Sequence, residues 1–473
     1  MVHEILSFQI GQCGNAIGLQ FWQNMGQEHG LNAAGELCKK DLLHAVDNKD
    51  SFFHQYESGR YVPRCIMLDL EPRVIQSIKN SDYSQLFEQR NMFVGEDGGG
   101  AGNNWSSGYM SAIKHADSLM DLIRRETEAM DLMEGSLITH GISGGTGSGM
   151  GSFILELLTD YFPKKTTQTY SVFPTSVNQV KRSEEGVLEG QYGDIVIEPY
   201  NSLLTLLRLT SYVDSVVILD NLALHNLTSA ALFLPHPSFA NINKIVSDVM
   251  TASIAPIRYP TTMFNCLSDI VLSLTPVPQL HFLMTGYTPL RSFDSQAQMK
   301  QIMKTSVESV MKRLGKMRNM MVSIFHPLHS RHGYISVFNV IQSNNLRESV
   351  WGVRQTVEQF RHRARYLPWA EPIYQTAHCP WSPYQMQRHR ISGLTMTNHS
   401  SIVSFFKSTL SQFGKLYSRM AYVNQMQNIS GFLELREELE ECKLSCENLI
   451  SEYEAALGKE YPKPVSEEYI GIC

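Results

Sequence analysis

Residues 143–149 read SGGTGSG, a run that follows the apolar stretch SLITHGI and precedes MGSFILELL. Glycines let the backbone approach a ligand closely, and a helix that begins here would present free N–H groups and the positive end of its dipole. The hydroxyl groups of Thr146 and Ser148 are further hydrogen-bond donors. The run therefore predicts a site for a phosphate or another anion.

Other glycine-containing motifs fit this run less well. A Walker A loop ends in GKS or GKT, and the nearest downstream lysine is Lys164. The dinucleotide fingerprint needs a glycine where Met150 stands. Gly141 to Gly145 match the G-x-S-x-G pattern of a hydrolase, which would make Ser143 a nucleophile. That pattern leaves the further glycines unexplained, so a phosphate loop is favoured and a conventional hydrolase is the alternative.

Three more polar loops follow predicted strands. Gln12-Cys13-Gly14-Asn15 follows ILSFQI, Asp69-Leu70-Glu71-Pro72 follows RCIML, and residues 98–105 read GGGAGNNW. Because ligands in doubly wound sheets bind beyond the carboxyl ends of the strands, we expect all these loops to converge there. Asp69 and Glu71 supply the hard oxygen atoms that Mg²⁺ prefers, and they would bind it through water beside a phosphate.

The elements that position these loops are predicted from the hydrophobic pattern. The first 220 residues alternate short apolar runs with amphipathic stretches, which indicates strands followed by helices and a doubly wound parallel sheet. Residues 261–390 mix helices with strands at QLHFLMTGY, NMMVSIF and YISVFNVI. From Ile391 the pattern indicates long helices, and Phe432 to Tyr453 carry an apolar stripe that we expect to pack on the chain itself.

Composition limits the class of protein. The chain has 473 residues, 43% of them hydrophobic, and a net charge of -6, with neither sign gathered into a long block. We therefore expect no nucleic acid and no membrane among its partners. The start MVHEILSFQI does not resemble a signal peptide, and the eight scattered cysteines indicate a reducing cytosol.

Together, the four loops resemble the nucleotide loops of the tubulin superfamily, and the resemblance extends over essentially the whole chain. Within that superfamily the chain is most similar to the gamma-tubulin family. The runs YFPKKTTQTYSVFP, PYNSLLTLLRLT, LHFLMTGYTPL, VMKRLGKMRNMMVS, WSPY and ISGLTMTNHSSI stand much as in that family. The ending YPKPVSEEYIGIC also differs from the dense acidic tails of most alpha and beta tubulins.

The resemblance implies a tubulin-like α/β fold. It consists of a doubly wound parallel-sheet GTP-binding domain at 1–220, a connecting core helix at 221–245, an intermediate mixed α/β domain at 246–390 and a C-terminal helical region at 391–473.

The resemblance also implies GTP or GDP with Mg²⁺ as ligands. Asp194 and Glu198 would lie near the ribose. Asn221 and Asn243 would hydrogen-bond the guanine edge, which would explain a preference for guanine over adenine. Phe239 would stack on the base. The residues beside the nucleotide, around its phosphates and near its metal would be Gln12, Cys13, Asp69, Glu71, Ala101, Gly102, Asn103, Ser143, Gly144, Gly145, Thr146, Gly147, Ser148 and Gly149.

A nucleating role follows from the same resemblance. The nucleotide would complete the end of the subunit to which alpha/beta-tubulin binds, and the opposite end would bind gamma-tubulin complex proteins. Lateral contacts between copies, partly through Thr288 to about Lys300, would form a ring that nucleates microtubules and caps their minus ends. The expected location is the cytoplasm, in the cytoskeleton at a microtubule-organising centre such as a centrosome, basal body or spindle pole. No catalytic residue is assigned, and GTP hydrolysis would be slow.

Some positions depart from the family pattern. Gly141 and Ala16 replace residues that could hydrogen-bond the nucleotide, and residues 175–193 form a longer loop than usual, expected to be a tolerated surface insertion. Asp269 stands where alpha-tubulin carries the glutamate that assists hydrolysis in the next subunit. In a gamma-tubulin that surface would face the complex proteins, so Asp269 is expected to be a contact residue and not a catalytic one. A divergent self-polymerising tubulin of the alpha/beta type is the alternative within the superfamily.

Overall fold

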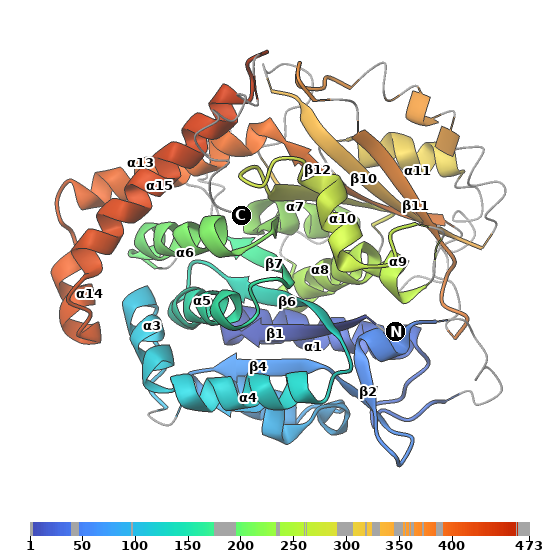
Figure 1. Ribbon diagram of the computed structural model, residues 1–473, viewed down its shortest axis with the longest axis horizontal. Helices are drawn as coiled ribbons and strands as arrows, with labels where there is room; N and C mark the ends of the chain where they lie inside the picture. Colours follow the sequence, from blue (N-terminus) through green and yellow to red (C-terminus); the bar gives the residue numbers. More distant parts are fainter. Residues whose placement is uncertain are drawn as a thin grey trace, which may run out of the picture.

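Ten strands form one twisted sheet, in the order β11-β10-β12-β9-β8-β7-β6-β1-β4-β5 (Figure 1). The computed structural model describes residues 3–38, 47–95, 98–174, 195–232, 237–259, 261, 263–290, 306–316, 319–323, 332–344, 353–354, 356–358, 360, 364–370, 373–384, 391–459 and 461. The strands are β1 (Glu4–Ile10), β4 (Cys65–Asp69), β5 (Met92–Val94), β6 (Met133–Gly141), β7 (Thr166–Phe173), β8 (Ser215–Asp220), β9 (Phe282–Thr288), β10 (Tyr334–Ser343), β11 (Ile373–Cys379) and β12 (Ile391–His399), with β2 (Phe53–Gln55) and β3 (Tyr61–Pro63) paired separately.

The strands from β5 to β9 pair in parallel throughout, which confirms the predicted doubly wound sheet. β12 then pairs antiparallel with both β9 and β10, and β10 pairs in parallel with β11. Successive side chains of β1 point to opposite faces, so Leu6 and Phe8 join one core while Ile5 joins the other.

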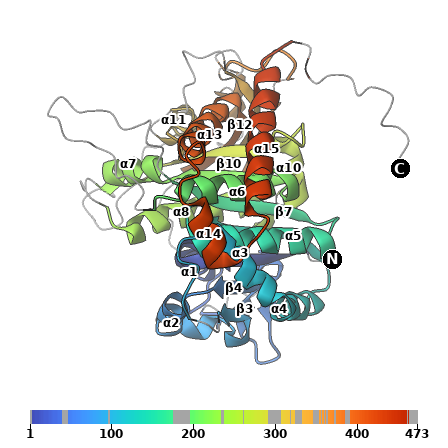
Figure 2. The same cartoon turned by 90° about the vertical axis from the view of Figure 1, so that its left-hand side faces the viewer.

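Helices cover both faces of the sheet (Figures 1 and 2). One layer contains α3 (Trp105–Lys114), α4 (Ala116–Glu128), α5 (Gly151–Tyr161), α6 (Glu198–Tyr212), α13 (Val403–Tyr417), α14 (Val423–Ser430) and α15 (Leu435–Ala455). The other contains α1 (Gly11–Glu28), α2 (Pro72–Lys79), α7 (Asn221–Leu232), α8 (Phe239–Ser253), α9 (Ala255–Arg258) and α10 (Leu267–Leu274), and α11 (Val307–Leu314) packs on β10 and β12. Short 3-10 helices lie at Lys49–Ser51, Ser84–Leu86, Gln89–Asn91 and Ser400–Ile402.

The structure corrects two expected elements. Ile391–His399 is a buried strand between β9 and β10, so the prediction that helices begin at Ile391 was wrong. The run NMMVSIF was predicted as a strand, but its described residues 319–323 form no strand. Met320 makes an isolated bridge opposite Gly286, and the backbone of Met321 hydrogen-bonds that of Thr285 and Asp220. At Ile391–His399, the pairing available between β9 and β10 determined the conformation more strongly than the local pattern did.

The predicted connecting helix at 221–245 falls on α7 and the first half of α8. β8 hydrogen-bonds directly to β9, so strands of the two predicted α/β domains share one sheet. The domain boundaries remain predictions.

The apolar stripe of α15 packs on the chain itself, as expected. Leu435, Leu439, Cys442, Cys446 and Tyr453 are buried, and α15 packs against α6 and α13 (Figure 2). Both cysteines are therefore part of the core. No helix in the described residues is long and apolar enough to cross a membrane.

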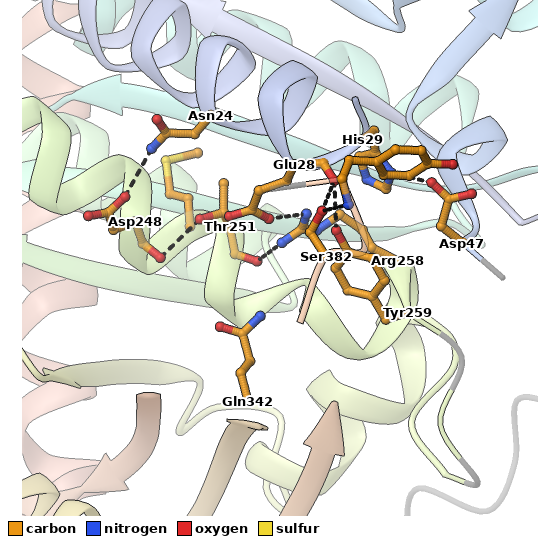
Figure 3. A network of polar contacts seen from close by, with 12 residues as sticks. Asn24, Glu28, His29, Asp47, Asp248, Thr251, Arg258, Tyr259, Gln342 and Ser382 are labelled. Carbon is orange, nitrogen blue, oxygen red and sulfur yellow. Dashed lines mark hydrogen bonds and ion pairs between the residues drawn. The ribbon is translucent and has the colours of Figure 1, made fainter. Parts of the chain in front are cut away.

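α1 ends in a buried polar network that ties it to α8, α9 and the segment around Ser382 (Figure 3). The fully buried guanidinium group of Arg258 pairs with the Glu28 carboxylate, and its Nη2 donates to the carbonyl oxygen of Thr251 at 2.6 Å. His29 lies 2.8 Å from Asp47 and stacks on Tyr259. Among the described residues, Nε of Arg258 and Nε2 of His29 lack partners. The charged groups at this end are thus paired within the chain.

Candidate functional site

The loop after β6 leaves one glycine open and packs the others. A Cβ atom at Gly147 would lie 2.7 Å from the carbonyl oxygen of Gly141, and one at Gly149 would overlap the carbonyl oxygen of Trp105. At Gly144, nothing lies within 4 Å of that position. A π-helical turn, Thr146–Met150, then leads into α5. The backbone at Gly144 therefore faces open space.

The two hydroxyl groups of this loop differ in availability. Ser148 is fully buried, and its hydroxyl group donates to the carbonyl oxygens of Gly144 and Gly145. Thr146 is half-buried. We therefore expect Thr146 to be the hydroxyl donor available to a ligand, whereas Ser148 holds the loop in shape.

Residues 98–103 form a loop that depends on left-handed backbone. Gly98, Gly100 and Gly102 have φ values of 61°, 66° and 56°, and Asn103 has a φ of 54°. Glycine adopts this region without steric cost, whereas other residues rarely do. A Cβ atom at Gly100 would also lie 2.8 Å from Cγ of Glu71, so the loop packs closely against that side chain.

The loop between β1 and α1 touches the phosphate-loop candidate. Gly11 has a φ of 73°, and a Cβ atom there would lie 2.8 Å from the backbone nitrogen of Gly147. Gln12 is exposed and Cys13 is half-buried at the first turn of α1. Burial raises the pKa of the Cys13 thiol to about 12, so this group stays neutral.

The acidic pair after β4 contains a buried oxygen without a partner. Oδ1 of Asp69 accepts a hydrogen bond from the backbone N–H of Glu71 at 3.1 Å. Among the described residues, no group donates to Oδ2, which is buried. Burial raises the pKa of Asp69 to about 6, and the nearby Glu71 carboxylate adds to the effect. A cation or a bound water would complete this side chain.

The four loops meet at one edge of the sheet, which confirms their expected convergence. The loop at Gly11 touches Gly147, Gly100 touches Glu71, and a Cβ atom at Gly145 would lie 2.7 Å from Cβ of Ala101. Most of the candidate phosphate and metal residues are therefore neighbours.

The candidate base-reading residues lie on the next strand-to-helix connection and on α8. Asn221 begins α7 directly after β8, which runs parallel to β6 and β7, so it stands at the same edge of the sheet. Phe239 begins α8 with 77% of its surface exposed, and Asn243 is half-buried one turn later. An exposed aromatic ring at a helix start suits stacking on a base.

Of the two residues expected near the ribose, the structure places only Glu198. Asp194 lies outside the described residues. Glu198 begins α6 and is half-buried among Pro174, Ser202 and Phe405. Burial raises the pKa of Glu198 to about 7, so its carboxyl group can act as a hydrogen-bond donor or acceptor near neutral pH.

The hydrolase alternative finds no support from the nearest histidine. Nδ1 of His140 lies 2.9 Å from the carbonyl oxygen of Gly147, and Nε2 lies 2.9 Å from Oγ of Ser171. A nucleophilic Ser143 would need a histidine free to take its proton. His140 instead holds the glycine loop against β7.

Three buried asparagines support the loops and were missed as site residues. Asn15 donates to the carbonyl oxygens of Gly11 and Leu68, both at 3.0 Å. Asn104 caps α3 by accepting from the backbone N–H of Ser106, and Asn201 joins two loops. In the sequence, the only available signal was a polar residue beside glycines or within an apolar helix.

Comparison with known families gives two matches. Residues 4–229 match the Tubulin/FtsZ family, GTPase domain, and residues 278–411 match the Tubulin C-terminal domain. The first match contains the four loops, Glu198 and Asn221, whereas Phe239 and Asn243 lie between the two matches.

Proposed function

The chain belongs to the tubulin superfamily and is a GTP-binding protein of that family, and from this premise we propose that it nucleates microtubules as a gamma-tubulin-like protein. The observation that carries the proposal is the set of long gamma-like runs, among them LHFLMTGYTPL and VMKRLGKMRNMMVS. The proposed partners are alpha/beta-tubulin, gamma-tubulin complex proteins and lateral copies of the chain. The proposed location is a microtubule-organising centre.

The residues present fit a magnesium-bound guanine nucleotide. Gly144 faces open space where a phosphate can approach, and Oδ2 of Asp69 is a buried acceptor without a donor among the described residues. Within the described residues, there is no cluster of three or more His, Cys, Asp or Glu side chains that could hold a metal ion by itself. Asp69 and Glu71 would therefore hold Mg²⁺ together with phosphate and water oxygens, and the ion would neutralise phosphate charge.

The base would be read from the other helix layer. Asn221 and Asn243 carry amide groups able to pair with the guanine edge, and Phe239 offers its exposed ring. Glu198 and Asp194 would lie near the ribose. In this arrangement the chain's own groups bind and orient the nucleotide, and none is assigned to hydrolysis.

For the self-polymerising alternative, the residue that would distinguish it is Asp269. This side chain is exposed in the first turn of α10, where a docked subunit could reach it. A carboxylate there could orient water for hydrolysis in a neighbouring subunit. In the nucleating protein, the same surface would contact complex proteins instead.

A nucleation assay separates these functions. Purified protein is mixed with alpha/beta-tubulin below its spontaneous assembly concentration, and filaments and capped ends are counted. The proposal predicts more filaments, each capped at its minus end, and equal activity for Asp269→Asn. Filaments formed by the chain alone, with hydrolysis slowed by Asp269→Asn, would establish the alternative.

A further inference from the structure

Asn201 connects two loops of the candidate site by hydrogen-bonding three of their backbone groups through one side chain. It is fully buried in the first turn of α6. Its Nδ2 donates to the carbonyl oxygens of Asn103 at 2.7 Å and Ser143 at 2.8 Å. Its Oδ1 accepts from the backbone N–H of Trp105 at 3.0 Å. The Asn201 amide thus makes three of its four possible hydrogen bonds with backbone groups of the phosphate loops.

The bond to Ser143 fixes the direction of the next backbone donor. In a planar trans peptide, the C=O and N–H bonds point in opposite directions. Because the Ser143 carbonyl group points at Asn201, the N–H of Gly144 points away from it. Nothing lies within 4 Å of the Cβ position at Gly144, and its N–H has no acceptor among the described residues. This N–H is therefore oriented and available for an anion.

The bond to Asn103 holds the second loop. Asn103 is a non-glycine residue with a left-handed φ of 54°, a conformation that needs support from its surroundings. The turn is closed by the backbone N–H of Asn104, which donates to the carbonyl oxygen of Ala101 at 3.0 Å. Asn201 thus keeps the end of this turn in register with the loop at Ser143.

We propose that Asn201 is a positioning residue for the phosphates: it holds the loop at Asn103 against the loop at Ser143, so that the backbone N–H of Gly144 is oriented before nucleotide binds. The inference rests on the proposed function, because it assumes that a phosphate group is the ligand of these loops. An amide suits this role, since its NH₂ group can donate to two carbonyl oxygens while its oxygen accepts from a backbone N–H.

The test uses Asn201→Ala and Asn201→Ser, with Thr205→Val as the matched control. Thr205 is also fully buried in α6, and its hydroxyl group donates to the carbonyl oxygen of Asn201 at 2.7 Å without touching either loop. The affinities for GMP, GDP, GTP and ATP are measured by equilibrium competition with Mg²⁺ present. Hydrogen exchange of residues 98–104 and 141–146 is measured in the nucleotide-free full-length protein.

We expect the gain in affinity from GMP to GTP to shrink by about tenfold or more in both Asn201 variants, because their loops must be ordered on binding. The preference for GTP over ATP stays as in the wild type, and exchange rises in the two loop segments. Thr205→Val changes none of these. General destabilisation would instead weaken all nucleotides equally.

A folded Asn201→Ser protein with unchanged phosphate gain and unchanged loop exchange would overturn the inference. If Asn201→Ala does not fold, the serine variant decides the matter. Wild-type protein that binds no guanine nucleotide would overturn the proposed function and the phosphate role with it, whereas loop exchange still shows separately whether Asn201 holds the loops.

Discussion

The two ends of α1 are built in opposite ways. At its start, the four loops leave Gly144 facing open space and the buried Oδ2 of Asp69 without a partner among the described residues. At its end, Glu28 pairs with the fully buried Arg258, and His29 lies 2.8 Å from Asp47 (Figure 3). The first end leaves an acidic acceptor and a glycine position open to a ligand. At the second end the charged groups pair within the chain, and only Nε of Arg258 and Nε2 of His29 lack partners among the described residues.

This difference separates binding from stability along one helix. Polar groups left open in a folded protein lower its stability unless a ligand completes them, whereas paired buried charges are costly to disrupt. We therefore expect changes at the loop end to alter nucleotide affinity more than folding. Changes at the Arg258 end should do the reverse.

The largest effect is expected for Arg258→Ala. Removing the guanidinium group leaves the Glu28 carboxylate without its partner and the carbonyl oxygen of Thr251 without a donor. The free energy of unfolding should fall by about 3–5 kcal/mol, measured by urea denaturation, with little change in nucleotide affinity of the protein that remains folded. Arg124→Ala, which removes an exposed arginine paired with Asp121, should change it by less than about 0.5 kcal/mol. A folded Arg258→Ala protein with unchanged stability would show that the two ends of α1 do not differ in this way.

Two glycines in the same loop give the next comparison. Gly149→Ala forces a methyl group against the carbonyl oxygen of Trp105 and should cost about 2–3 kcal/mol of stability. Gly144→Ala meets no atom within 4 Å and should leave the melting temperature unchanged. Its methyl group occupies the proposed phosphate space, so GTP affinity should fall by about tenfold or more. Equal effects of both variants on stability would contradict the open position of Gly144.

Asp69→Asn should stabilise the protein without nucleotide while weakening its binding. The pKa of Asp69 rises from 3.8 to about 6 on folding, so its neutral form is favoured in the folded protein. Its contribution to stability is complete below the unfolded pKa and is lost as the pH rises through about 6. At about pH 7.5, Asp69→Asn should therefore raise the free energy of unfolding by about 2 kcal/mol, and the gain should vanish near pH 4.

Denaturation of nucleotide-free protein at both pH values tests this prediction, and Asp82→Asn, an exposed change at a surface turn, is the control. The dependence of GTP affinity on Mg²⁺ should also weaken in Asp69→Asn. Stability that falls at neutral pH would show that the carboxylate already has a partner in the folded chain.

The smallest effect is expected at Asn24, one turn before the end of α1. Nδ2 of Asn24 donates to Oγ of Ser247 at 2.7 Å and to Oδ1 of Asp248 at 3.0 Å, which ties α1 to α8. Asn24→Ala should cost about 1 kcal/mol of stability and change nucleotide affinity by less than about twofold. Gln27→Ala, which removes an exposed bond to Tyr83, serves as the control. A tenfold loss of affinity in Asn24→Ala would show that binding and stability are not separated along this helix.

The sequence predicted the loop end well because its signals are local. Glycine runs and acidic residues stand directly after apolar strands, and parallel strands bring those positions to one edge. The Arg258 network could not be predicted in the same way, since Glu28 and Arg258 lie far apart in the chain and neither motif indicates the other. Asn201 likewise contacts loops 98 and 58 residues away.

The wrong prediction of helices from Ile391 has a similar cause. Ile391–His399 reads ISGLTMTNH, in which apolar and polar residues alternate only over Leu394 to Thr397. The segment is buried along its whole length because β9 and β10 flank it and helices cover it. A strand in that position needs no alternating pattern, so only the tertiary structure reveals it.

The most direct test of the central claim is chromatographic identification of nucleotide released by denaturing the purified chain. We expect stoichiometric GTP or GDP from the wild type and from Asn24→Ala, and a clear reduction from Gly144→Ala. Release of an adenine nucleotide, or of no nucleotide from a folded wild-type protein, would contradict the assignment of the loops at the start of α1 as a guanine-nucleotide site.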